Sequence, residues 1–320
     1  MKTKTLGWIV VLGATVCSFA SCSQAKVECQ VLLAGAGYAY ATQYVLKGSP
    51  SAECLPYVQK GDLIGMEFYN PASADGRTYD TSKVSLGVQA DWLGNELTAR
   101  GPATNTTGKP WALGSFTSHL PDEKTSICSV PTLAVAEQHF GDVKAMKGVG
   151  GAGGGAMPPM SEVPEDDVSY QWKNIQVYTT AAAQGTQFTA DLTFKEKVTK
   201  FDPMTMAPTV VADCTFEYKV IGMGPGIPCT KVDAKGNAVL DAGGKQQSDA
   251  SLCSPCTDVD AGRTIASGIN PDFPTVCTAI LGDPDAYGRP AFYCMLKDTT
   301  ANATIPQLGS APVCPSDSFM

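Results

Sequence analysis

Histidine and positive charge are both scarce in this sequence. The 320 residues include two histidines, His119 and His139, and 23 lysines and arginines against 31 acidic residues. The resulting net charge of −8 argues against a nucleic-acid-binding protein, because contacts to phosphates need an excess of basic side chains. Neither an HExxH nor a G-x-S-x-G pattern occurs, so the usual motifs of zinc proteases and esterases are missing. We therefore predict no metal, no cofactor and no catalytic residue, and leave open whether the protein has an enzymatic activity.

Long apolar runs are also rare, and the one that stands out lies at the N-terminus. Residues 6–19 are apolar or small, and they follow Lys2 and Lys4. This run is shorter than the ~20 residues that a helix needs to span a bilayer, whereas a basic start before such a run is typical of a secretory signal peptide. We expect residues 1–21 to be that signal peptide.

A short motif closes this segment. Phe19-Ala20-Ser21-Cys22 resembles the lipobox of bacterial lipoproteins, in which small residues precede a cysteine that becomes lipidated. The resemblance implies that Cys22 is the acylated N-terminus of the mature chain, and several acyl chains together hold a protein stably at a membrane. By the sorting rules of such lipoproteins, Ser23 implies an outer-membrane anchor in the cell envelope. The alternative is ordinary cleavage after Ala25, which would give a periplasmic or secreted protein.

Cysteine, by contrast, is abundant, with twelve in the chain. If Cys17 leaves with the signal peptide and Cys22 carries lipid, an even number remains for disulfides: Cys29, Cys54, Cys128, Cys214, Cys229, Cys253, Cys256, Cys277, Cys294 and Cys314. Disulfides of this density are typical of exported proteins. The last six fall among glycine, proline and aspartate, so we predict a loop-rich, disulfide-stapled region at residues 229–320. For the first four we predict the pairs Cys29–Cys54 and Cys128–Cys214.

Alternation of apolar and polar residues predicts a mainly β fold. Residues 187–195 and 213–220 alternate with a period of two, and residues 170–180 are rich in aromatic and β-branched side chains. Half-buried strands have this pattern, so residues 168–221 should form a three-stranded antiparallel meander. Shorter strands are expected at 39–46, 63–69 and 83–90.

These strands predict an antiparallel, sandwich-like domain over residues 22–228. Within it, residues 133–147 are expected to form a helix, and residues 148–160 to form a glycine-rich loop. Three of the cysteines precede that loop, and an odd number requires at least one disulfide to cross it if all are paired.

Two sets of residues are candidates for a functional site. Cys253-Ser254-Pro255-Cys256 has the CxxC spacing of thiol–disulfide oxidoreductases, although no helix pattern begins at Cys256, and structural disulfides explain the motif better. The second set is a group of aromatic side chains that could stack on sugar rings, as in a carbohydrate-binding module, or could instead fill a β core. Its members are Tyr38, Tyr40, Tyr44, Trp92, Trp111 and Trp172.

The chain as a whole is similar to the uncharacterised cysteine-containing lipoproteins of myxobacteria, through its lipobox-like start, its alternating strands and its cysteine-rich tail. That resemblance implies no activity. We expect an exported, lipid-anchored envelope protein with a structural or binding role. Its partners would be the membrane, through the lipid, and envelope proteins or glycans, with no nucleic acid. Carbohydrate binding and thiol–disulfide exchange are the alternatives.

Overall fold

The computed structural model describes residues 27–32, 39–80, 82–100, 107–141, 165–201, 207–256, 267, 269–281 and 290–310. Several predictions concern residues outside these ranges, namely the signal peptide, Cys22, Tyr38, the glycine-rich loop 148–160 and Cys314. Within them the protein is mostly β, with antiparallel strands and a disulfide-bonded C-terminal region, so the predicted fold class is confirmed.

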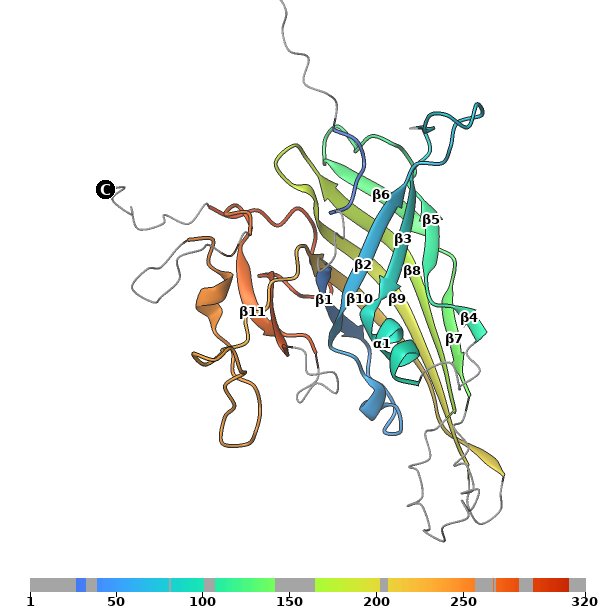
Figure 1. Cartoon of the computed structure of the whole chain (residues 1–320), viewed down its shortest axis with the longest axis vertical. Helices are drawn as coiled ribbons and strands as arrows, with labels where there is room; N and C mark the ends of the chain where they lie inside the picture. Colours follow the sequence, from blue (N-terminus) through green and yellow to red (C-terminus); the bar gives the residue numbers. More distant parts are fainter. Residues whose placement is uncertain are drawn as a thin grey trace, which may run out of the picture.

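Three long neighbouring strands form the central part of the sheet (Figure 1). They are β8 (Glu165–Thr179), β9 (Gln184–Phe201) and β10 (Pro208–Met223), and each pairs antiparallel with the next. Alternate residues of each strand are buried, among them Trp172, Phe194 and Tyr218, while their neighbours face outwards. The predicted meander is therefore confirmed, because its period of two buries one face of every strand.

The remaining strands extend the sheet on both sides of this meander. In spatial order the sheet is β4-β7-β8-β9-β10-β1-β2-β3-β5, and β6 pairs with the other half of β8. The strands not yet introduced are β1 (Tyr40–Lys47), β2 (Gly61–Tyr69), β3 (Ser85–Ala90), β4 (Thr107–Lys109), β5 (Ala112–Ser115), β6 (Ile127–Thr132) and β7 (Ala136–Phe140).

The sheet curls until its ends nearly meet. Beside β5 and β6, the Thr117 N–H donates to the Ser129 carbonyl oxygen over 2.9 Å, and the Ala134 N–H donates to the Leu113 carbonyl oxygen over 2.7 Å. The curled sheet thus encloses the main buried apolar cluster of the described residues. The largest fully buried side chains of this core include Trp172, Tyr40, Tyr170, Tyr218, Phe188 and Phe194.

The helix predicted at residues 133–147 is wrong over its described part. Residues 136–140 form β7, whose side chains are alternately buried and exposed, and β7 pairs with β8. Pairing with β8 outweighed the weak local preference for a helix. The sequence instead missed α1 (Asp91–Arg100), where the buried Asp62 carboxylate accepts from the Trp92 N–H in the first turn, at 3.3 and 3.1 Å.

Four disulfides are described, and the predicted pairing of the first two is wrong. The bonds are Cys29–Cys128, Cys54–Cys214, Cys229–Cys277 and Cys253–Cys294. Cys54–Cys214 crosses the glycine-rich loop in sequence, as the odd number of cysteines before that loop required. Cys256 is also disulfide-bonded. Of the four described pairs, two lie before residue 228 and two lie after it.

The C-terminal region packs against one side of the curled sheet (Figure 1). It contains the hairpin of β11 (Thr275–Ala279) and β12 (Phe292–Leu296) and the short helix η2 (Ala250–Cys253); a second short helix, η1 (Leu55–Tyr57), follows β1. Leu296 and Cys294 share a buried apolar cluster with Ile221 and Met223 of β10. The predicted domain boundary at residue 228 stays a prediction. No helix within the described ranges is long and apolar enough to cross a membrane.

Candidate functional site

Most of the aromatic residues proposed from the sequence do not form a ligand face. Tyr40, Tyr44 and Trp172 are 1%, 4% and 1% exposed, because their strands turn them into the core. Trp92 is partly buried and packs edge-on against Phe194, with ring centroids 6.4 Å apart. The prediction is thus wrong for these buried rings, and the alternative, that they fill a β core, is correct.

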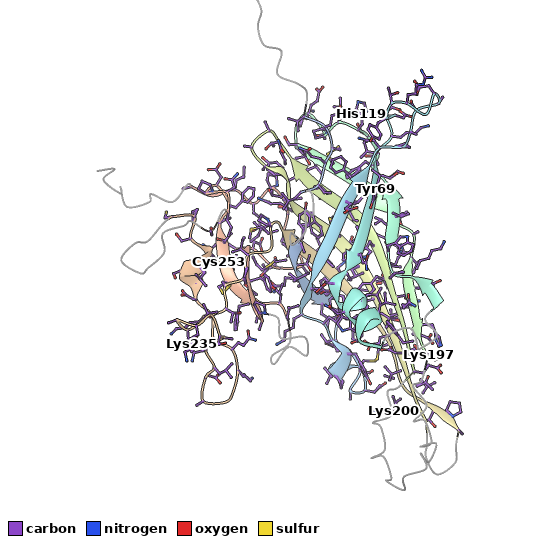
Figure 2. The ribbon with its side chains drawn as sticks, viewed as in Figure 1. Tyr69, His119, Lys197, Lys200, Lys235 and Cys253 are labelled. Carbon is purple, nitrogen blue, oxygen red and sulfur yellow. A yellow bond between two sulfur atoms is a disulfide. The ribbon has the colours of Figure 1, made fainter. Side chains whose placement is uncertain are left out.

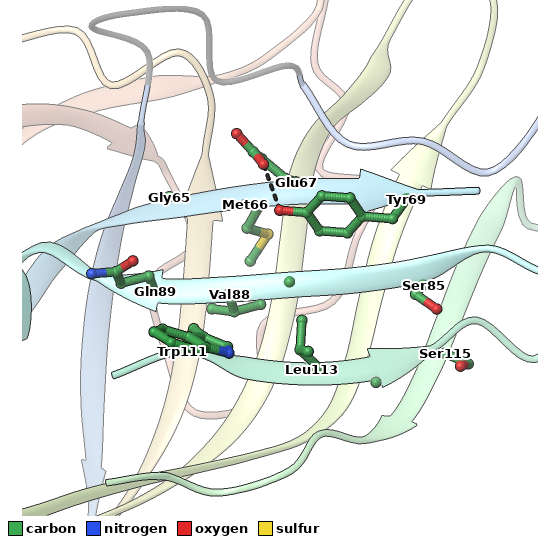
Figure 3. A pocket seen from close by; sticks show the side chains of 12 residues that line it. Gly65, Met66, Glu67, Tyr69, Ser85, Val88, Gln89, Trp111, Leu113 and Ser115 are labelled. Carbon is green, nitrogen blue, oxygen red and sulfur yellow. Dashed lines mark hydrogen bonds between the residues drawn. The ribbon is translucent and has the colours of Figure 1, made fainter. Parts of the chain in front are cut away.

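Trp111 is the exception, since it is 48% exposed. It lies just before β5, at one end of a groove of about 840 Å³ on the outer face of β2, β3 and β5 (Figure 3). The groove is lined by Gly65, Met66, Glu67, Tyr69, Ser85, Gly87, Val88, Gln89, Trp111, Leu113, Gly114 and Ser115. We call it the β2–β3–β5 groove.

Strand register explains how this groove is built. Outward-facing residues recur at every second position, and Glu67 of β2, Gly87 of β3 and Leu113 of β5 lie side by side in one row across the three strands. A Cβ atom at Gly87 would lie 3.1 Å from a Tyr69 ring carbon and 3.4 Å from a Leu113 methyl carbon. The missing side chain at Gly87 therefore leaves the floor low between Tyr69 and Leu113.

Three large apolar side chains of this groove are exposed to solvent. Tyr69 and Leu113 are each 48% exposed, like Trp111. Figure 3 shows the Tyr69 ring over β2 and Trp111 beside Gln89 at the opposite end, with Leu113 between them. Exposed aromatic surface that gathers in one concave place marks an interaction site more often than scattered apolar residues do.

A hydrogen bond fixes the orientation of the Tyr69 ring. Its hydroxyl donates to Glu67 Oε2 over 2.6 Å. This hydrogen bond, together with partial burial and the charge of Glu67, raises the pKa of Tyr69 above its ordinary value of 10. Tyr69 is therefore neutral at physiological pH, and it presents an uncharged ring beside a carboxylate.

The chemistry of the lining residues suits binding better than catalysis. Glu67 is the one carboxylate among the twelve lining residues, which also include the hydroxyls of Ser85 and Ser115 and the amide of Gln89. Hydrolysis of a glycosidic bond ordinarily needs two carboxyl groups. These polar groups can donate to and accept from a bound ligand, while the ring faces of Trp111 and Tyr69 supply apolar contact.

The CxxC motif does not form the internal bond that thiol exchange requires. Cys253 pairs with Cys294 on β12 instead of with Cys256. The sulfur atoms of Cys229, Cys253 and Cys277 lie close together, but all three are oxidised in disulfides and offer no thiolate to a metal. The cysteines of this region therefore act as staples.

Tyr69 and Leu113 were missed by sequence reasoning. The end of the strand predicted at residues 63–69 did contain Tyr69, and alternation from the buried Ile64 and Met66 would have placed it on the outer face. Leu113 had no such signal, because β5 is only four residues long.

A comparison with known protein families gives one match. The family model described as MlpA matches residues 38–225, which is more than half of the chain and covers β1 to β10, including the β2–β3–β5 groove. No curated protein and no solved structure matches the chain.

Proposed function

Because this chain belongs to the MlpA family, we propose that it is an exported, lipid-anchored protein of the bacterial cell envelope that binds a saccharide in its β2–β3–β5 groove. The observation that carries the binding role is the groove itself, where Tyr69, Trp111 and Leu113 expose apolar surface around a floor lowered at Gly87.

Export and anchoring are supported by the N-terminal segment and by the cysteines. The N-terminus combines a basic start, an apolar run and the lipobox-like Phe19-Ala20-Ser21-Cys22. The cysteines within the described residues are all disulfide-bonded, and disulfides form and persist in oxidising compartments outside the cytosol. In this proposal Cys22 carries the lipid, and Ser23 directs the protein to the outer membrane.

The saccharide assignment follows from the mixture of groups in the groove. A sugar ring has apolar C–H faces that stack on aromatic planes and hydroxyls at its edges that need partners. Trp111 and Tyr69 provide ring faces, and Glu67 and Gln89 provide an acceptor and a mixed donor and acceptor at the same face. With Glu67 as the one charged lining residue, the groove favours a neutral saccharide over an anionic one.

The anchor is tested by metabolic labelling. Cells that produce the protein are grown with labelled palmitate, and we expect label in the wild-type protein and none in the Cys22→Ala variant. Mass spectrometry of the mature N-terminus provides the second readout, since acylated Cys22 and a start after Ala25 differ in mass. An unlabelled wild-type protein that begins after Ala25 would refute the lipid anchor, but it would not bear on saccharide binding in the groove.

The groove is tested by calorimetric titration with neutral oligosaccharides chosen from a glycan array. Trp111→Ala and Tyr69→Ala should each weaken binding by at least ~10-fold, which corresponds to about 1.4 kcal/mol. Tyr79→Ala is the matched control, because Tyr79 is 74% exposed and does not line the groove. Equal losses of saccharide affinity in Tyr69→Ala and Tyr79→Ala would contradict a saccharide site in the groove. Failure of the wild-type protein to bind any glycan on the array would contradict it as well.

A further inference from the structure

A second group of side chains, none of which lines the β2–β3–β5 groove, gathers on the outer side of β7 and β8. His139 of β7 lies directly opposite Asp167 of β8 in the register. Glu165 lies two residues before Asp167 on the same strand, and residues two apart in a strand point to the same face. The three side chains therefore meet on one face, held by two hydrogen-bonded strands.

The donor atoms of these three residues are already close together. His139 Nδ1 and Asp167 Oδ1 are 2.5 Å apart, and one ligand atom from each of His139, Glu165 and Asp167 lies within 4.8 Å of the others. The side chains of His139 and Asp167 are 37% and 45% exposed, so an ion could reach them from solvent. Because the scaffold is a strand pair, the backbone need not rearrange for the three to act together.

We propose that His139, Glu165 and Asp167 bind a divalent cation of the borderline class, such as Zn²⁺. One imidazole and two carboxylates make a donor set that suits zinc, and three protein ligands leave a fourth position for water. This site is independent of the saccharide groove. The sequence predicted no metal because the ligands come from two strands joined only in the fold, and no short motif marks them.

The charge around the site favours a cation. The depression beside His139 and Asp167 is also lined by the outward-facing Glu137 and Asp213, against Lys195 and Lys197. Carboxylates thus outnumber ammonium groups, and the field of such a surface raises the local concentration of cations.

Binding requires a small adjustment of the hydrogen bond between His139 and Asp167. Donor atoms on one tetrahedral zinc ion lie about 3.3 Å apart, given metal–ligand distances near 2.0 Å. The imidazole nitrogen and the carboxylate oxygen are closer than that in the structure, so they separate by roughly 0.8 Å as the ion replaces the shared proton. Rotation of two partly exposed side chains is sufficient for this movement.

The positive charge of Lys197 weakens cation binding at this site. It lies directly opposite Asp167 on β9 in the register, on the other side from His139. Its ammonium group competes with a cation for the Asp167 carboxylate, so the Lys197→Met variant should bind Zn²⁺ more tightly than the wild-type protein.

The scarcity of histidine makes a direct test simple. The purified chain, with its disulfides intact, is labelled with ¹⁵N at the histidine rings and titrated with Zn²⁺. The two histidines give two sets of ring signals, and His119 serves as an internal control because it lies at the opposite end of the molecule from Lys197 (Figure 2). We expect the His139 signals to shift and saturate at one ion per chain, with those of His119 unchanged. Unchanged His139 signals would overturn the site.

Variants distinguish a specific Zn²⁺ site from nonspecific attraction of cations to an acidic surface. His139→Ala, Glu165→Gln and Asp167→Asn should each lower Zn²⁺ affinity at least ~100-fold in calorimetry, since even partners outside the ligand shell contribute 10–100-fold. Asp213→Asn is the matched control, because Asp213 lines the same depression but is not among the three. Its effect should stay within about threefold, as for a change in the surrounding field only. Equal losses for Asp213→Asn and Glu165→Gln would overturn the proposal.

Discussion

Removal of the disulfide between Cys54 and Cys214 tests how the curled sheet is stabilised. This bond joins the segment just before η1 to β10, and its cysteines are 6% and 1% exposed. The double substitution Cys54→Ala, Cys214→Ala leaves no free thiol behind. Since strand pairing of β10 holds Cys214, and a backbone hydrogen bond from the Cys54 N–H to the Ser51 carbonyl oxygen helps to hold Cys54, we expect the substitution to act mainly on the unfolded chain.

The size of the effect follows from the loop that the bond closes. Cys54 and Cys214 are 160 residues apart, but the intact Cys29–Cys128 bond gives a shorter route of about 110 residues between them. The chain-entropy relation assigns about 4.8 kcal/mol to a loop of that length near room temperature. For comparison, Cys29–Cys128 closes 99 residues, and its removal should lower the free energy of unfolding by a nearly equal amount, about 4.7 kcal/mol.

Urea unfolding, followed by circular dichroism and by tryptophan fluorescence, measures this loss. The free energy of unfolding should fall by up to ~4.8 kcal/mol, and the m-value should rise because the unfolded chain exposes more surface when it is less constrained. The Cys29→Ala, Cys128→Ala variant is the matched control. A loss below about 1 kcal/mol, or a large loss with an unchanged m-value, would refute the explanation through the unfolded chain.

Three single substitutions test other parts of the structure. Gly87→Val should abolish saccharide binding, because its Cβ would lie 3.1 Å from the Tyr69 ring; calorimetry checks this, and unchanged affinity would contradict the groove. Asp62→Ala should lower the free energy of unfolding by about 1–2 kcal/mol, because the Trp92 N–H loses its acceptor; a thermal melt with an unchanged midpoint would contradict this. Burial raises the pKa of Tyr218 from 10 to about 12, so the stability that the neutral Tyr218 hydroxyl contributes is complete below pH 10 and is lost as the pH rises towards 12. Between pH 10 and pH 12 the free energy of unfolding should therefore fall less steeply for Tyr218→Phe than for the wild-type protein. Identical slopes would contradict the raised pKa of Tyr218.

The strands of the meander could be predicted from the sequence, because alternation is a local signal. From Phe188 to Phe194 in β9 and from Ala212 to Val220 in β10, every second side chain is apolar, and that pattern decides which face is buried. The same signal could not say whether a buried ring such as Tyr40 or Trp172 belongs to a core or to a binding face. That distinction depends on the curling of the sheet, which turns the apolar face inwards.

The disulfide pairing and the groove depend on neighbours that are distant in sequence. Cys29 and Cys54 were expected to pair because they are close along the chain, yet Cys29 reaches Cys128. Similarly, Tyr69 and Trp111 share the β2–β3–β5 groove only because β3 lies between β2 and β5. Sequence spacing contains no information about that order, and β5 is too short to show a period of its own.

The place of β1 in the sheet has a consequence for the timing of folding. Among the described strands β1 comes first in the sequence. It pairs with β2 on one side and on the other with β10, which is the last of this sheet's strands in sequence order. During synthesis one edge of β1 therefore stays open until residues up to Met223 are available. Such distant pairings make folding slow, and an open strand edge is prone to pair with other chains. A ribosome that stalls before β10 would thus leave an aggregation-prone chain.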